Sequence, residues 1–139
     1  MKALAVPLYA ALLGASLVAA AQAAVPTVAA LRWHRRIVLV ASPRPDDPRA
    51  IAQRHILHDW RRGAADRDVA LVEVSGGQVR GVADGAAALA ARYRLAPGRF
   101  QVLLIGKDGQ VALRAVRPLA AARLQGAIDA MPMRRAGGR

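Results

Sequence analysis

Short, predominantly apolar runs separated by helical stretches are the feature that most constrains the fold of this chain. Residues 37–41, 69–74 and 100–105 form three such runs. A run this short and this rich in Val, Ile and Leu is typical of a strand buried on both faces of a sheet. Residues 111–116 follow the third run after Asp108 and Gly109, a pair that favours a tight hairpin. The sequence therefore predicts four strands.

Helices are predicted between and after these strands. Asp47 has the chemistry of an N-cap, and Pro48 suits the first helical position. From there to residue 62, apolar residues recur every four positions, and Gly63 is predicted to end this helix. Two further helices are predicted at residues 84–94 and 118–131.

The predicted order of elements is β-α-β-α-β-β-α. Strands joined through a helix lie parallel with a right-handed crossover, whereas the tight hairpin makes the last two strands antiparallel. The expected fold is therefore a thioredoxin-like α/β fold, with a four-stranded mixed sheet and helices on both faces. Residues 76–81 contain three glycines and are predicted to form only a turn.

Residues 1–23 are predicted to be a secretory signal peptide. Lys2 supplies a positive end, residues 3–21 are apolar, and Ala21 and Ala23 place small residues where a signal peptidase reads them. An uncleaved anchor is the competing interpretation, because the apolar run approaches the ~20 residues that a spanning helix needs. Cleavage would leave residues 24–139 as a single domain without a transmembrane segment, exported to the periplasm or secreted.

The net charge is +12, from 21 Lys and Arg against nine Asp and Glu. In the cytosol such a charge would suggest nucleic acid, but export argues against that partner. The anions outside the inner membrane are lipid headgroups, glycans and acidic envelope proteins, and we expect the partner among them. Alternatively, the arginine excess reflects only a composition typical of high-GC coding.

The chain contains no cysteine. Disulfides, thiol catalysis, cysteine-type zinc sites and iron–sulfur clusters are therefore excluded. A thioredoxin or peroxiredoxin places its reactive cysteine between the first strand and the first helix, where the helix dipole stabilises a thiolate. Here that segment holds Asp46 and Asp47 instead. The protein is therefore neither a thiol oxidoreductase nor a thiol peroxidase.

Three stretches of the chain form a recognisable set: residues 31–40, residues 103–109 and the signature IDAMPMRR at residues 128–135. In order and spacing they resemble a domain-of-unknown-function family of small exported bacterial proteins, which is related to domains in sushi-repeat-containing proteins and equarin. The resemblance implies a thioredoxin- or peroxiredoxin-like fold over the mature chain and carries no established enzymatic activity.

Few residues are candidates for acid–base or metal chemistry. His55, His58 and Asp59 have a spacing that can place ligands on one helix face. No further ligand is evident, so neither a metal site nor a cofactor is predicted. Capping accounts for Asp47, and no catalytic residue is assigned. An enzyme of unrecognised type that uses Asp46 and Asp47, or the two histidines, remains the alternative.

The arginine clusters carry the leading functional hypothesis. In the predicted topology the first strand begins, and the first and last helices end, at the pole opposite the redox loop. Guanidinium groups suit phosphate, carboxylate and sulfate. We therefore predict a non-catalytic module that binds an anionic partner through this basic pole. Alternatively these arginines only complement helix dipoles, or the protein is a structural accessory subunit of an envelope complex. The basic pole comprises Arg32, Arg35, Arg36, Arg61, Arg62, Arg134 and Arg135.

Overall fold

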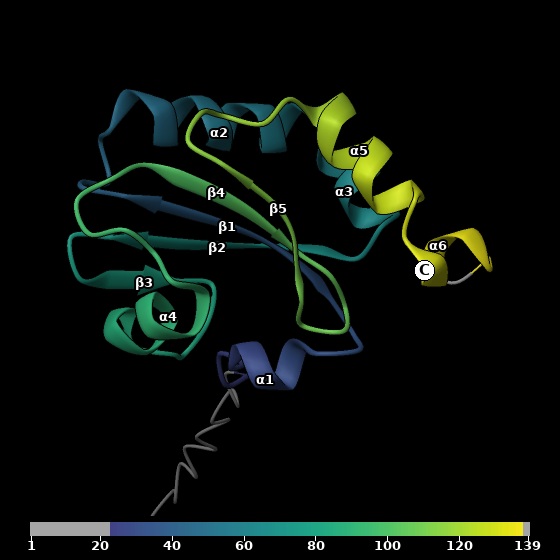
Figure 1. Cartoon of the computed structure of the whole chain (residues 1–139), viewed down its shortest axis with the longest axis horizontal. Helices are drawn as coiled ribbons and strands as arrows, with labels where there is room; N and C mark the ends of the chain where they lie inside the picture. Colours follow the sequence, from purple (N-terminus) through teal and green to yellow (C-terminus); the bar gives the residue numbers. More distant parts are fainter. Residues whose placement is uncertain (1–22, 138–139) are drawn as a thin grey trace, which may run out of the picture.

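A computed structural model describes residues 23–137 of the chain (Figure 1). Residues 1–22, which make up nearly all of the predicted signal peptide, lie outside the described part. No helix within residues 23–137 has the length and apolar character needed to cross a bilayer. The elements are α1 (Val28–Leu31), β1 (Arg36–Ser42), α2 (Pro48–Asp59), α3 (Arg61–Ala65), β2 (Val69–Ser75), β3 (Gln78–Arg80), α4 (Ala86–Tyr93), β4 (Gln101–Ile105), β5 (Val111–Ala115), α5 (Ala121–Asp129) and α6 (Pro132–Arg135).

The protein is a mixed α/β fold with one five-stranded sheet in the order β3-β2-β1-β4-β5. Strand β1 pairs in parallel with β2 and antiparallel with β4, and β4–β5 and β2–β3 are antiparallel pairs. The prediction of four strands is wrong, because β3 returns beside the end of β2. The prediction that strands joined through a helix lie parallel is confirmed for β1 and β2 and is wrong for β2 and β4, because β3 reverses the chain before α4. Gly76 and Gly77 form the two-residue turn, with φ of +54° and +81°. Glycine adopts these angles without steric cost.

Helices cover both faces of the sheet. Figure 1 shows α2 and α5 on one face and α4 on the other, with α1 on the α4 side. Alternate residues of the central strands supply the two cores. Val38 and Leu104 lie on the α2–α5 side with Leu124, while Leu39 lies on the α4 side with Leu89. All five side chains are fully buried. The start of β1, α3 and α6 lie at the same end of the sheet (Figure 1).

The first predicted helix begins as expected but ends earlier. Asp47 caps α2 by accepting the Arg49 backbone N–H at 2.9 Å, which confirms the predicted N-cap. The prediction that Gly63 ends this helix is wrong: α2 ends at Asp59, the chain turns at Trp60, and Gly63 lies inside α3. A Cβ on Gly63 would overlap the Trp60 indole. Glycine is therefore needed here to make room for an aromatic ring.

The last helix begins later than residue 118, and the prediction of one helix to residue 131 is wrong. Gln53 of α2 holds the backbone of Leu119 in an extended segment. Its Oε1 accepts the Leu119 N–H at 2.6 Å, and its Nε2 donates to the Leu119 carbonyl at 3.1 Å. Helix α5 therefore starts only at Ala121 and ends at Asp129. Pro132 then begins a separate helix, α6, instead of only stopping the previous one.

Candidate functional site

The Arg36 side chain is buried at the end of the sheet where β1 begins. The side chain is 1% exposed, and its Nη1 donates to the Arg67 carbonyl at 2.8 Å. Its Nε is buried and has no hydrogen-bond partner among the described residues. Burial, and next the positive charge of Arg134, lower the pKa of Arg36. This arginine of the predicted basic pole is therefore internal, where it cannot touch a macromolecular partner directly.

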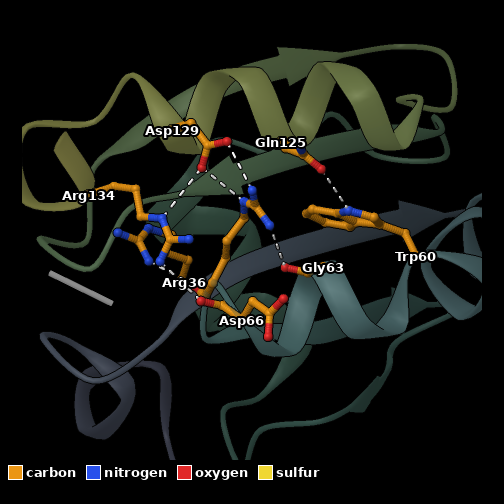
Figure 2. Close-up of polar contacts among 8 residues, drawn as sticks. Arg36, Trp60, Gly63, Asp66, Gln125, Asp129 and Arg134 are labelled. Carbon is orange, nitrogen blue, oxygen red and sulfur yellow. Dashed lines mark hydrogen bonds and ion pairs between the residues drawn. The ribbon is translucent and has the colours of Figure 1, made fainter. Parts of the chain in front are cut away.

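Arg67 and Asp129 form the main ion pair of this end. Figure 2 shows Asp129 with the Arg134 side chain beside it. Arg67 Nε lies 2.9 Å from Asp129 Oδ1 and Nη2 lies 3.0 Å from Oδ2, a two-bond contact that joins α5 to the chain before β2. The Arg67 hydrogen bond lowers the pKa of Asp129. Arg134 adds a 3.5 Å contact to Asp129 and donates to the Asp66 carbonyl at 3.1 Å. The network thus fastens α6 onto the segment that follows α3.

Cations outnumber carboxylates in this network. Lys107, 7% exposed, pairs with Asp68 at 2.9 Å. Besides this lysine, the network holds three guanidinium groups, while Asp68 and Asp129 are its two paired carboxylates. The field at this end of the sheet is therefore positive, and an added anion would be stabilised there. The guanidinium groups are those of Arg36, Arg67 and Arg134.

A groove of about 730 Å³ lies beside this network, along α2, α3 and the start of β2. Three arginines and two histidines line it, and no carboxylate does. Leu57, Val69 and Leu71 supply apolar lining. We call it the arginine groove; its arginine and histidine lining residues are Arg35, Arg54, Arg61, His55 and His58.

The three arginines of the arginine groove differ in their partners. Arg54 forms an ion pair with Glu73 at 3.1 Å and also donates to the Pro45 carbonyl. Arg61 donates to the His58 carbonyl at 3.2 Å. Within residues 23–137, neither Arg35 nor Arg61 has an ion pair to a carboxylate. Two guanidinium charges are therefore available to a partner at the groove.

The predicted members of the basic pole fall into separate environments. Arg35 and Arg61 share the arginine groove, while Arg36 and Arg134 belong to the internal network. Arg32 lies over the Trp33 ring, 4.9 Å from its centroid. The remaining two are exposed, Arg62 on α3 and Arg135 on α6. That the pole binds a partner stays a prediction.

The aspartates singled out as a possible acid–base pair each have an arginine partner. Asp47 accepts from the Arg49 guanidinium as well as capping α2, and this hydrogen bond lowers the pKa of Asp47 to about 2. Asp46 is exposed and lies 3.3 Å from Arg44. In the described part of the chain, no group of three or more His, Asp or Glu side chains is arranged to hold a metal ion.

Several residues of this end were not identified from sequence. Arg54 of the groove and Arg67 of the network lie among many arginines, so nothing in the local sequence distinguishes them. Trp33 and Lys107 do carry a signal. They lie in two of the three stretches that show the family resemblance, residues 31–40 and 103–109. The third stretch supplies Asp129 and Arg134, so all three stretches meet at this end.

Comparison with known proteins identifies a family of unknown function. A family model described as "Domain of unknown function (DUF4174)" matches residues 27–137. No curated protein matches the chain.

Proposed function

The chain belongs to the DUF4174 family of domains of unknown function, and we propose that it is a non-catalytic module that binds an anionic partner in the arginine groove. The single observation that carries the proposal is the groove's lining. Within residues 23–137 it combines two arginines without carboxylate partners, two histidines and apolar side chains, and no acid lies among them. Such a lining attracts carboxylate, sulfate or phosphate groups and excludes cationic partners.

The scaffold in this proposal is thioredoxin-like. The proposal is supported by the order of β2, β1, β4 and β5 in a mixed sheet and by the helices on both of its faces. Strand β3 then extends the edge at β2. Because the chain has no cysteine, the scaffold serves as a support for binding and not for thiol chemistry. We also propose that residues 24–139 form the mature domain, exported to the periplasm or the medium, on the strength of the signal-like residues 1–23.

Among the anionic partners considered, an acidic protein segment suits the groove best. Strand β3 pairs only with Glu73–Ser75, and Gly81 lies against the Leu71 carbonyl, so in the described structure the Val69–Ala70 start of β2 is the part whose outer edge is open. An exposed strand edge can pair with an added extended segment through its backbone. Val69 and Leu71 would contact apolar side chains of that segment, and Arg35 and Arg61 would pair with its carboxylates.

The test is binding of residues 24–139 to a fluorescein-labelled peptide of alternating glutamate and valine, measured by fluorescence anisotropy. The Arg35→Ala/Arg61→Ala variant should bind at least tenfold more weakly than the parent. The control is Arg99→Ala/Arg123→Ala, which removes the same charge from exposed positions elsewhere and should bind nearly as the parent does. Added salt should weaken binding, because the contacts are between partly exposed charges.

Two further arms identify the class of partner. Vesicles that contain phosphatidylglycerol and the acidic glycan polygalacturonate replace the peptide in parallel titrations. Binding of vesicles or glycan, with no binding of the peptide, would refute the proposal that the partner is an acidic protein segment. The broader proposal of an anionic partner would stand. Equal weakening by the two double variants would overturn the groove itself, because the interaction would then depend only on net charge.

A further inference from the structure

A second pocket, separate from the arginine groove, lies where the three family-like stretches meet. Its volume is about 350 Å³, at the small end of the range for ligand sites. Trp33 comes from the segment before β1, Lys107 from the β4–β5 turn, and Met131 and Met133 from the junction of α5 and α6. Ala112 of β5 completes one wall. The walls are therefore largely aromatic and thioether in character.

Arg36 lines this pocket and supplies its strongest polar feature. The side chain is 1% exposed, and its buried Nε lacks a hydrogen-bond acceptor among the described residues. A buried N–H without a partner is rare in folded proteins, because it loses its hydration and gains nothing in return. The Arg36 Nε–H is therefore a donor without an acceptor, and it can donate to an anionic oxygen of a molecule bound in the pocket.

Trp33 is fixed at the pocket by a hydrogen bond of its own backbone, while its side chain stays largely exposed. Its φ is +69°, in the left-handed region that a bulky residue rarely adopts, and its side chain is 55% exposed. The Trp33 N–H donates to the Lys107 carbonyl at 2.6 Å, which anchors the residue to the β4–β5 turn. Strained residues of this kind tend to occur at functional sites, where the fold compensates for the strain.

The charge around Arg36 favours an anion. The Arg134 guanidinium lowers the pKa of Arg36, and Asp68 and Asp129 each raise it by less. Lys107, which is paired with Asp68, also lines the pocket. Asp108 is the one carboxylate in the lining, and its Oδ1 accepts the Gln110 N–H at 3.0 Å within the turn. That carboxylate is therefore engaged with the turn backbone.

We propose that this pocket binds a small aromatic carboxylate. The carboxylate accepts from Arg36, and the ring packs against Trp33 and the two methionines. Sulfur–aromatic and aromatic–aromatic contacts suit a flat ring there, and a planar carboxylate matches the planar guanidinium. The inference is independent of the partner bound in the arginine groove, because it uses a different cavity and different side chains.

Trp33 itself reports on the pocket. The chain has two tryptophans, so the Trp60→Phe variant leaves Trp33 as the only indole. Phenylacetate, phenylacetamide and acetate are titrated against this variant while Trp33 fluorescence is recorded. Phenylacetate should give a saturable change, whereas phenylacetamide, which lacks the charge, should bind at least tenfold more weakly. Acetate, which lacks the ring, should give no saturable change.

Two variants in this Trp60→Phe background locate the binding. Arg36→Met should abolish phenylacetate binding, but removal of a buried charge can also unfold the protein. Ala112→Phe therefore serves as the second variant, because it fills the pocket from an exposed position of β5 and leaves Arg36 intact. It should abolish binding while the far-UV circular dichroism and the unfolding midpoint stay unchanged.

The Arg35→Ala/Arg61→Ala substitutions, which disable the arginine groove, should leave phenylacetate binding unchanged, so failure of one proposal is distinguishable from failure of the other. Three results would overturn the pocket proposal. They are equal affinity for the acid and the amide, undiminished binding by Ala112→Phe, and the lack of any saturable change with phenylacetate. The last is the result expected if a buried water alone satisfies the Arg36 Nε.

Discussion

Replacing Gly63 with alanine sets two physical effects of opposite sign against each other. Alanine favours a helix over glycine by about 1 kcal/mol, so helix α3 should gain stability. In the folded protein, however, the new Cβ would overlap the Trp60 indole and lie 2.7 and 2.8 Å from its Cδ1 and Cε2 atoms. The indole must move away to admit the methyl group.

The contacts of the Trp60 ring decide which effect is larger. Its Nε1 donates to Gln125 Oε1 at 3.3 Å, Arg67 lies 6.0 Å from the ring centroid, and the ring packs against the α2–α5 core. Loss of the hydrogen bond, the cation–π contact and some apolar burial costs about 2–3 kcal/mol. After the helix gain, we expect Gly63→Ala to destabilise the protein by about 1–2 kcal/mol.

Urea unfolding followed by far-UV circular dichroism measures this change without relying on tryptophan fluorescence. Gly126→Ala in α5 is the matched control, because nothing lies within 4 Å of a Cβ at that position. It should stabilise the protein by up to about 1 kcal/mol. In a Trp60→Ala background Gly63→Ala should also become stabilising, since the obstructing ring is gone. If Gly63→Ala stabilises the parent as much as Gly126→Ala does, the indole is not seated over Gly63 and the reasoning fails.

Two other substitutions test local features of the fold. Because the Arg49 hydrogen bond lowers the pKa of Asp47 to about 2, its ionised form stabilises the fold above the unfolded-state pKa of about 4, and this contribution disappears as the pH falls toward 2. Urea unfolding across that range should therefore show Asp47→Asn less stable than the parent at neutral pH. The difference should shrink as the pH falls from about 4 to about 2 and vanish below about 2, and a difference that is independent of pH would contradict the assignment. Gly81 has a φ of +95°, and a Cβ there would overlap the Leu71 carbonyl oxygen. Gly81→Ala should therefore lower the free energy of unfolding by at least about 1 kcal/mol. A variant as stable as the parent, or more stable, would refute this prediction.

The local sequence was sufficient where burial alone determines structure. The apolar runs at residues 37–41 and 100–105 became β1 and β4, because a continuous apolar segment is unfavourable anywhere except between two covered faces. Strand β3 was not predicted. Its three residues alternate between exposed and half-buried, and they form a strand only because β2 offers an edge with which they can pair. The sequence of residues 76–81 does not indicate that β2 has an edge available for pairing.

The candidate site was less accessible to sequence reasoning. Arg36 looks like its neighbour Arg35 in sequence, yet Arg36 is buried and Arg35 is exposed. The difference depends on Arg67, Asp129 and Arg134, which surround the Arg36 side chain from distant parts of the chain. Local periodicity carries no information about such contacts. That the three family-like stretches meet at one end of the sheet could be found only from the structure.

The central position of β1 has a consequence for how the protein matures. This strand is made first, yet both of its partners come later: β2 follows two helices, and β4 follows β2, β3 and α4. A growing chain that stops before Gln101 lacks β4, one of the two strands that flank β1. The hydrophobic interior can therefore close only after most of the polypeptide has been synthesised.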